Sequence, residues 1–300
     1  MRIKSTPMTW FTILLIITSL LAILVPANPA SLHSLQISEA AYRLVMVTLL
    51  VPYAIIWFAA FYGYDQLERY SRALIFTGEG QAFHKIANGL GVLAWGLIVQ
   101  VLLSLIFNAI LLSHPGFDGV KTIVDGYFGL AIALIAFVFI ENGTYELVQL
   151  VRAHHSHAIS RAIIVVGAII GALFQHVIFL NQATGNNPHH LSTYPLLFTI
   201  IVPYIFTWII AIVSVYELNL YATKVKGLLY KHALQFLANG LSVVILLSVT
   251  IQFIDAATNP GTNSSLAVIL LYDYLLLAAV ALGFVLVAVG AKRLKRIEEV

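Results

Sequence analysis

Two aspartates within apolar runs are the residues of this sequence best placed to do chemistry. Asp125 and Asp273 each lie in a long run that is otherwise uncharged. A carboxylate is costly inside a membrane and is therefore a candidate for binding a solute or an ion. Both lie within about two helical turns of one end of their runs, where they could instead reach lipid headgroups or pair with Arg43 or Lys121. The sequence leaves both interpretations open.

Polar amides occur in two other apolar runs. Gln100 and Asn108 share one run, and Gln252 lies in another. Hydrogen bonds between neighbouring membrane helices, worth about 1 kcal/mol or less each, explain such residues without any ligand. Gln100 and Gln252 therefore join the two aspartates as candidate intramembrane polar residues.

A ten-residue pattern of threonine, proline, tyrosine and tryptophan occurs twice. It reads TLLVPYAIIW from position 48 and TIIVPYIFTW from position 199. Proline within a helix leaves the carbonyl four residues earlier without its donor, and a threonine occupies that position in both copies. A threonine hydroxyl can satisfy such a broken turn inside a membrane. The pattern predicts either a fixed kink that shapes packing or a hinge that lines a cavity, with the candidate residues Thr48, Pro52, Tyr53, Thr199, Pro203 and Tyr204.

Histidines gather in the polar stretches between apolar runs. His154, His155 and His157 lie close together, and His84 and His232 lie in two other polar stretches. Imidazoles three apart on a helix could share a metal, but no HExxH pattern adjoins them and the chain contains no cysteine. We interpret these histidines as solvated or in contact with headgroups. The sequence predicts no metal, no cofactor and no catalytic residue, and it does not favour an enzyme.

The elements that must hold these residues are membrane-crossing helices. Hydrophobic residues make up 60% of the chain and charged residues 10%, whereas roughly a quarter of a soluble domain is charged. Runs of about 20 apolar residues are long enough to cross a bilayer as helices. We expect an all-α integral membrane protein with eight transmembrane helices, at about 8–25, 40–64, 86–112, 122–140, 162–180, 193–216, 236–254 and 267–290.

The first of these runs could also be a secretory signal, because small residues follow it at 27–30. Its apolar run is longer than the usual signal core of roughly 7–15 residues. It also has a counterpart in the run at 162–180. We therefore interpret it as a membrane span.

The two copies of the ten-residue pattern belong to a longer duplication. They lie 151 positions apart, and the same offset pairs Tyr70 with Tyr221. In the 43 positions that begin at Thr48, 13 residues are identical to those of the second copy. The matches include proline, tryptophan, asparagine and glycine, which apolar composition does not supply by chance. The match is looser near Asp125, because Tyr127 pairs with Tyr274 at a different offset.

We predict two parallel four-helix repeats, residues 1–150 and 151–300, joined in the polar stretch 141–161. An even number of helices gives both repeats the same orientation, related by an axis along the membrane normal. The offset also matches Asn88-Gly89 with Asn239-Gly240, near the expected starts of the third and seventh helices. There we expect the asparagines to cap backbone donors and the glycines to allow close helix packing.

The basic residues indicate the orientation in the membrane. All Lys and Arg residues except Arg43 and Lys121 lie at the two termini or in the stretches 65–85, 141–161 and 217–231. Basic residues collect on the cytoplasmic side of membrane proteins, so both termini are expected in the cytoplasm. The same placement accounts for the pI of about 9.0 without nucleic acid as a partner. We expect a prokaryotic plasma membrane, because the sequence shows no cysteine, no transit signal and few residues outside the apolar runs.

The sequence predicts architecture more firmly than function. The expected partners are the lipid bilayer and a small solute or ion, bound or passed between the two repeats. The alternative is a membrane scaffold or sensor that does not transport and acts through partner proteins. The sequence predicts neither the ligand nor the oligomeric state.

Overall fold

The structure is a computed structural model that describes residues 38–113, 118–151, 202–258 and 266–298, together with a few positions between 9 and 20. No strand occurs in these residues, so the predicted all-α architecture is confirmed for them. The long helices described are α3 (Glu39–Ala73), α4 (Gly78–Ser113), α5 (Asp118–Val151), α8 (Val202–Lys224), α9 (Leu228–Thr258) and α10 (Leu266–Glu298).

Four stretches of these helices are long and apolar enough to cross a membrane. They are Gly78–Gln100, Ala131–Val151, Leu228–Ile245 and Leu277–Ile297. These helices indicate a multi-pass membrane protein. In their described parts, α3 and α8 contain no such stretch, although both are helical where spans were predicted.

The predicted count of eight helices extends beyond what the structure describes. The predicted fifth span, 162–180, lies outside the described residues, and so does most of the first, 8–25. Eight spans therefore stay a prediction, whereas the six helices and four apolar stretches are observed.

The polar stretches between the predicted spans are largely helical where the structure describes them. Only residues 74–77 separate α3 from α4, and only residues 225–227 separate α8 from α9. The stretch expected to join the two repeats is still helical as far as Val151, the last residue of α5. At about 1.5 Å per residue, a helix the length of α4 measures about 54 Å, against about 30 Å of hydrocarbon. We therefore expect the charged turns to be the ends of helices that project beyond the lipid.

Ion pairs one turn apart stabilise the projecting end of α3. Arg69 lies 3.0 Å from Asp65, and Arg72 lies 2.8 Å from Glu68. Such pairs add a few tenths of a kcal/mol each to an exposed helix. This is why a stretch that looks like a loop by hydropathy continues the helix.

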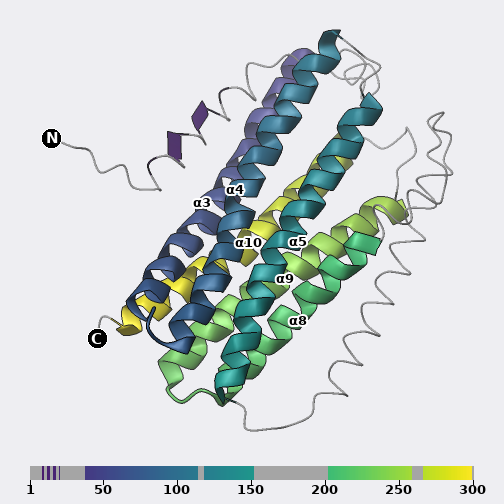
Figure 1. Ribbon diagram of the computed structural model, residues 1–300. Helices are drawn as coiled ribbons and strands as arrows, with labels where there is room; N and C mark the ends of the chain where they lie inside the picture. Colours follow the sequence, from purple (N-terminus) through teal and green to yellow (C-terminus); the bar gives the residue numbers. More distant parts are fainter. Residues whose placement is uncertain are drawn as a thin grey trace.

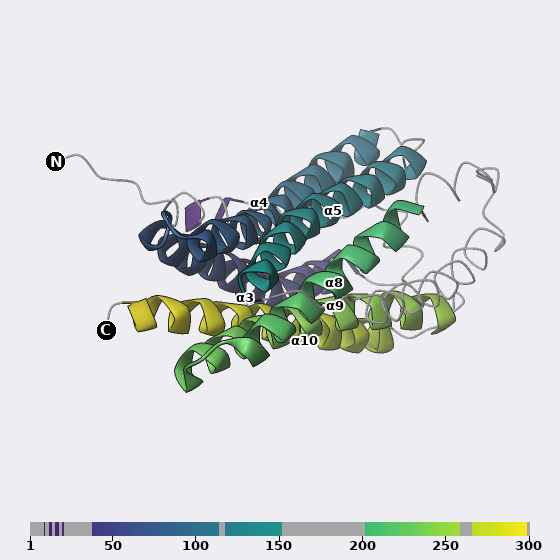
Figure 2. The ribbon, with the colours of Figure 1, turned by 60° about the horizontal axis from the view of Figure 1, so that its bottom comes forward.

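The six helices form a closed ring. Along it the neighbours are α3, α4, α5, α8, α9 and α10, and α10 packs against α3 again. Figure 1 shows the bundle with the turns between α3 and α4 and between α8 and α9 at the same end. Figure 2 shows α4 and α5 on one side of the bundle, and α9 and α10 on the other. Helices α3–α5 and helices α8–α10 thus occupy the ring as two consecutive triplets.

Glycines bring α4 against α5, and α9 against α10, backbone to backbone. A Cβ atom at Gly89 would lie 2.5 Å from the carbonyl oxygen of Ala136, and one at Gly240 would lie 2.6 Å from that of Gly283. No side chain fits at these distances. The close helix packing predicted at Gly89 and Gly240 is confirmed.

A second pair of glycines makes the reciprocal contacts. A Cβ atom at Gly143 of α5 would lie 2.5 Å from the carbonyl oxygen of Ala82 on α4. One at Gly290 of α10 would lie 2.8 Å from the carbonyl oxygen of Ala233 on α9. Each helix pair is therefore held together by a glycine from either partner, at matching positions in the two triplets.

The asparagines beside these glycines do not cap helices, which corrects that prediction. Asn88 and Asn239 lie about three turns inside α4 and α9, because both helices begin earlier than hydropathy indicated. The cap of α4 is Thr77, whose hydroxyl oxygen accepts a hydrogen bond from the Gly80 N–H at 3.0 Å.

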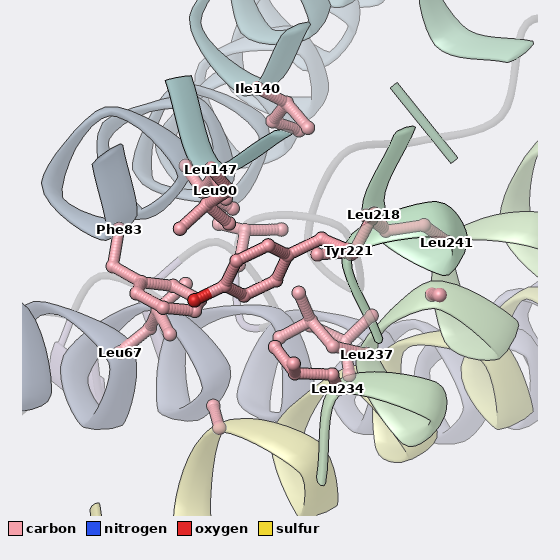
Figure 3. Close-up of a cluster of buried hydrophobic side chains, with 14 of the residues drawn as sticks. Leu67, Phe83, Leu90, Ile140, Leu147, Leu218, Tyr221, Leu234, Leu237 and Leu241 are labelled. Atoms are coloured by element: carbon pink, nitrogen blue, oxygen red, sulfur yellow. The ribbon is translucent and has the colours of Figure 1, made fainter. Parts of the chain in front are cut away.

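A buried apolar core joins the two triplets of helices. Figure 3 shows the side chain of Tyr221 extending from α8 towards Phe83 and Leu67 of the other triplet. Packing between membrane helices relies on dispersion contacts and small residues, and this core supplies both. The core includes Leu67, Phe83, Leu90, Ile140 and Leu147 from the first triplet and Leu218, Tyr221, Leu234, Leu237 and Leu241 from the second.

Candidate functional site

A cavity of about 340 Å³ lies inside the ring of helices and receives side chains from all six. Its volume is within the usual range for small-molecule sites, roughly 300–1,000 Å³. The lining residues are Tyr53, Ile56, Leu93, Leu97, Gln100, Ile132, Ala133, Phe137, Thr207, Trp208, Ala211, Val244, Ile245, Leu277, Val280 and Phe284.

Two of the candidate residues from the sequence line this cavity. Tyr53 comes from α3, one residue after the buried Pro52, and Gln100 comes from α4. Thr48 also lies on α3, but it is exposed and does not line the cavity. Pro52 therefore lies next to a residue that lines the cavity. Helix α3 continues through the proline without a break.

The other candidates are only partly described. Pro203 and Tyr204 lie in the first turn of the described α8, and their side chains lie outside the description. Thr199 lies outside the described residues altogether. The side chains of Asp125, Gln252 and Asp273 also lie outside it, although all three positions are helical.

Equivalent positions of the two triplets line the cavity in pairs. Ile56 and Thr207 are 151 positions apart, and so are Leu93 and Val244. On α5 and α10 the offset is 147, and it pairs Phe137 with Phe284 and Ala133 with Val280. Tyr127 and Tyr274 have this second offset as well. The cavity therefore lies where the two triplets face one another.

Sequence reasoning missed a polar cluster around Glu79, in the first turn of α4. The carboxylate accepts hydrogen bonds from the hydroxyl of Tyr70, at 3.3 Å, and from that of Tyr230. The hydroxyls of Tyr230 and Tyr221 lie 3.5 Å apart. Burial raises the pKa of Tyr221 and the nearby Glu79 carboxylate adds to the shift, so this phenol stays protonated at physiological pH.

The cluster contains two pairs of positions that are equivalent in the two triplets. Glu79 and Tyr230 lie 151 positions apart and are bonded to each other. Tyr70 and Tyr221 lie at the same offset, and each is nine residues before its partner in the cluster. The offset in the sequence matched the two tyrosines, but no sequence signal indicated that positions 79 and 230 would meet.

Another carboxylate at this end of the molecule, which is buried, pairs with a histidine. Glu68 is 8% exposed and lies 2.9 Å from His84 Nδ1 and 2.8 Å from Arg72. The hydrogen bond between Arg72 and Glu68, together with the negative charge of Glu68, raises the pKa of Arg72. The His84 side chain is 39% exposed and also contacts this buried acid, a contact that the sequence did not indicate.

Two further glutamates form contacts that link separate helices. Lys85 pairs with Glu146, joining α4 to α5. The Thr144 hydroxyl donates to Glu217 at 3.1 Å, joining α5 to α8. Within the described ranges, no three His, Asp or Glu residues are grouped as a metal site, and His154, His155 and His157 lie outside those ranges.

Taken together, the long apolar helices and the cavity among them define an all-helical, multi-pass membrane protein. No protein-family model, curated protein or solved structure matches the chain.

Proposed function

We propose that the protein binds a small solute or ion, or passes it across the membrane, between two related halves, helices α3–α5 and α8–α10. The observation that carries this proposal is the cavity, which both triplets line from equivalent positions. Ligand sites are commonly found between the helices of bundles. In membrane transporters built from repeats, such sites lie between the repeats.

The same glycine contacts occur in both triplets, which supports our proposal that the two halves arose by duplication. The glycine contacts of α4 with α5 recur between α9 and α10, at Gly89 and Gly240 and again at Gly143 and Gly290. The order of the helices around the ring is also the same in each triplet. An ancestral four-helix unit that was duplicated accounts for these contacts and for the repeated ten-residue pattern.

The proline beside the cavity supports movement in the pathway. Pro52 removes one backbone hydrogen bond from α3, and the next residue, Tyr53, lines the cavity. We propose that Pro52 and its counterpart Pro203 are paired hinges. Bending there would change the width of the cavity while the glycine-packed helix pairs stay rigid.

The orientation follows from charge. The ends of α3, α8 and α10 carry Arg72, Lys224 and the pair Lys295 and Arg296. We propose that this end is cytoplasmic, in a plasma membrane, by the tendency of basic residues to stay inside. The Glu79 and Glu68 clusters then lie at the cytoplasmic side of the helices.

The experiment uses single cysteines in this cysteine-free chain. Gln100→Cys and Thr207→Cys, both in the cavity, should react with neutral, water-soluble methyl methanethiosulfonate in the membrane-embedded protein. Leu218→Cys, in the buried core, should stay unmodified, and the exposed Thr223→Cys should react fully. Intact-protein mass spectrometry measures the modification. Cavity cysteines as unreactive as Leu218→Cys would refute the solute pathway.

One observation favours the alternative of a scaffold or sensor. Apolar side chains are exposed at the two short turns, where Phe76 is 98% exposed and Leu229 is 74% exposed. Exposed apolar groups of this kind can mark a site for a partner protein. A double substitution, Phe76→Ser with Leu229→Ser, should leave thiol reaction in the cavity unchanged in both cases. If solute binding is the function, the double substitution should also leave function in cells unchanged. It should abolish function in cells without changing the cavity if the scaffold alternative is correct.

A further inference from the structure

We infer that the cavity takes a neutral, largely apolar molecule with one or two hydrogen-bonding groups, and that it does not take an ion. The inference rests on the proposed function and narrows its ligand to one chemical class. It is drawn from the lining of the cavity and from the places where the described charges lie.

The lining holds no charged side chain among the described residues. An unpaired ion in a medium of low dielectric constant loses far more hydration energy than apolar walls return. The buried Glu68 and the half-buried Glu79 pair with other side chains, at the other end of α3 and in the first turn of α4. The described part of the lining therefore offers an ion no counter-charge, whereas a neutral molecule needs none.

Hydrogen-bonding groups of the lining lie among aliphatic and aromatic side chains. Gln100 on α4 brings an amide, Thr207 on α8 brings a hydroxyl, and Tyr53 on α3 brings a phenol. Phe137 and Phe284 bring rings from α5 and α10. A few polar groups among apolar walls are the usual composition of a site for a small neutral ligand, in which the polar groups set the orientation of the ligand.

Two sources could supply such a molecule. It could be a free solute, or it could be part of a membrane lipid that enters between helices. The chemistry that the lining recognises is the same in both cases. The experiment therefore includes one measurement for each source.

The experiment compares three probes of one shape and different charge. These are 1-adamantanol, the 1-adamantylammonium cation and the adamantane-1-carboxylate anion, each titrated into the purified protein by calorimetry at pH 7. We expect the alcohol to bind at least 10-fold more tightly than either ion. In parallel, organic extraction followed by mass spectrometry counts the lipids retained per protein.

Matched variants locate the binding. Ala133→Phe fills the cavity and should abolish binding of the alcohol and retention of any specific lipid, whereas Ala131→Phe, exposed two residues earlier on α5, should change neither. Thr207→Val keeps the shape of the side chain and removes its hydroxyl. It should weaken alcohol binding by about 3- to 10-fold, the usual effect of one neutral hydrogen bond.

Each outcome decides the inference. Alcohol binding that Ala133→Phe abolishes supports it with a free solute as the source, and a retained lipid that the same variant releases supports it with a lipid as the source. An ion that binds as tightly as the alcohol overturns the inference and leaves the proposed function intact. No bound probe and no retained lipid would overturn both, as would unreactive cysteines in the cavity.

Discussion

The Glu79 carboxylate is shared by tyrosines from both triplets of helices, Tyr70 from the first and Tyr230 from the second. Glu79 is half-buried, and an acceptor of this kind that serves several donors costs more to remove than an exposed one, because its partners are left unsatisfied. We expect Glu79→Ala to lower the free energy of unfolding by about 2–3 kcal/mol. Thermal denaturation of the purified protein would measure it.

The control is Glu146→Ala, which removes an acid whose ion pair with Lys85 is much more exposed. Exposed pairs contribute about 0–1 kcal/mol. Equal losses in the two variants would mean that the tyrosine cluster does not hold the halves together.

Trp57 presents the opposite case, a buried donor with no hydrogen-bond acceptor among the described residues. Its ring is 1% exposed and packs with Tyr53 at a centroid distance of 6.1 Å. In Trp57→Phe, the relief of an unsatisfied donor offsets the lost volume, so we expect a change below about 1 kcal/mol. Trp57→Ala should cost about 3 kcal/mol or more through its cavity. Equal losses in unfolding assays would reveal an acceptor elsewhere in the chain.

Single residues were partly predictable from the sequence. Tyr53 was identified by the repeated pattern around Pro52, Gln100 was identified as a polar residue within an apolar run, and both line the cavity. Glu79 was not, because the sequence offset shows which positions are equivalent and does not show which of them meet across the molecule. The contact of His84 with Glu68 was missed because hydropathy does not show how short the turn is that brings α4 back beside α3.

Helix pairs are the units that the glycines define. At Gly89 and Gly240, a side chain larger than hydrogen would push α5 or α10 away from its partner. We expect Gly89→Leu or Gly240→Leu to destabilise the protein by at least about 3 kcal/mol or to abolish its expression. Asn239→Leu, at an exposed position next to Gly240, is the matched control and should not lower stability. Fluorescence size-exclusion chromatography after heating compares them, and unchanged stability in both glycine variants would contradict close packing.

The helices themselves were predictable, and their ends were not. Hydropathy marks only the part of a helix that lies in lipid, about 30 Å, so the charged last turns of α3 and α8 looked like loops. Their helical state depends on local pairs such as Glu68 with Arg72 and on packing against the neighbouring helix. The mistaken capping role of Asn88 and Asn239 follows from the same error in the helix starts.

The whole molecule has one basic end, and its orientation can be tested independently of function. Reporter fusions after the positions near the basic stretches should behave as cytoplasmic, because basic residues are retained on that side of the membrane. Fusions in the other loops should be external, and an inversion at any middle loop would contradict the eight-span topology. The cytoplasmic set is Arg72, Arg152, Lys226 and Val300, and the external set is His33, His114, Asn186 and Asn259.

We propose that two equivalent halves enclose a site for a solute, and an electron cryomicroscopy map of the purified protein in lipid nanodiscs would show whether they do. We expect α3–α5 to superpose on α8–α10 by a rotation of about half a turn around the membrane normal. We also expect the cavity between them to hold density that no side chain explains. A map without this rotation, or one in which protein side chains fill the cavity, would refute the proposal.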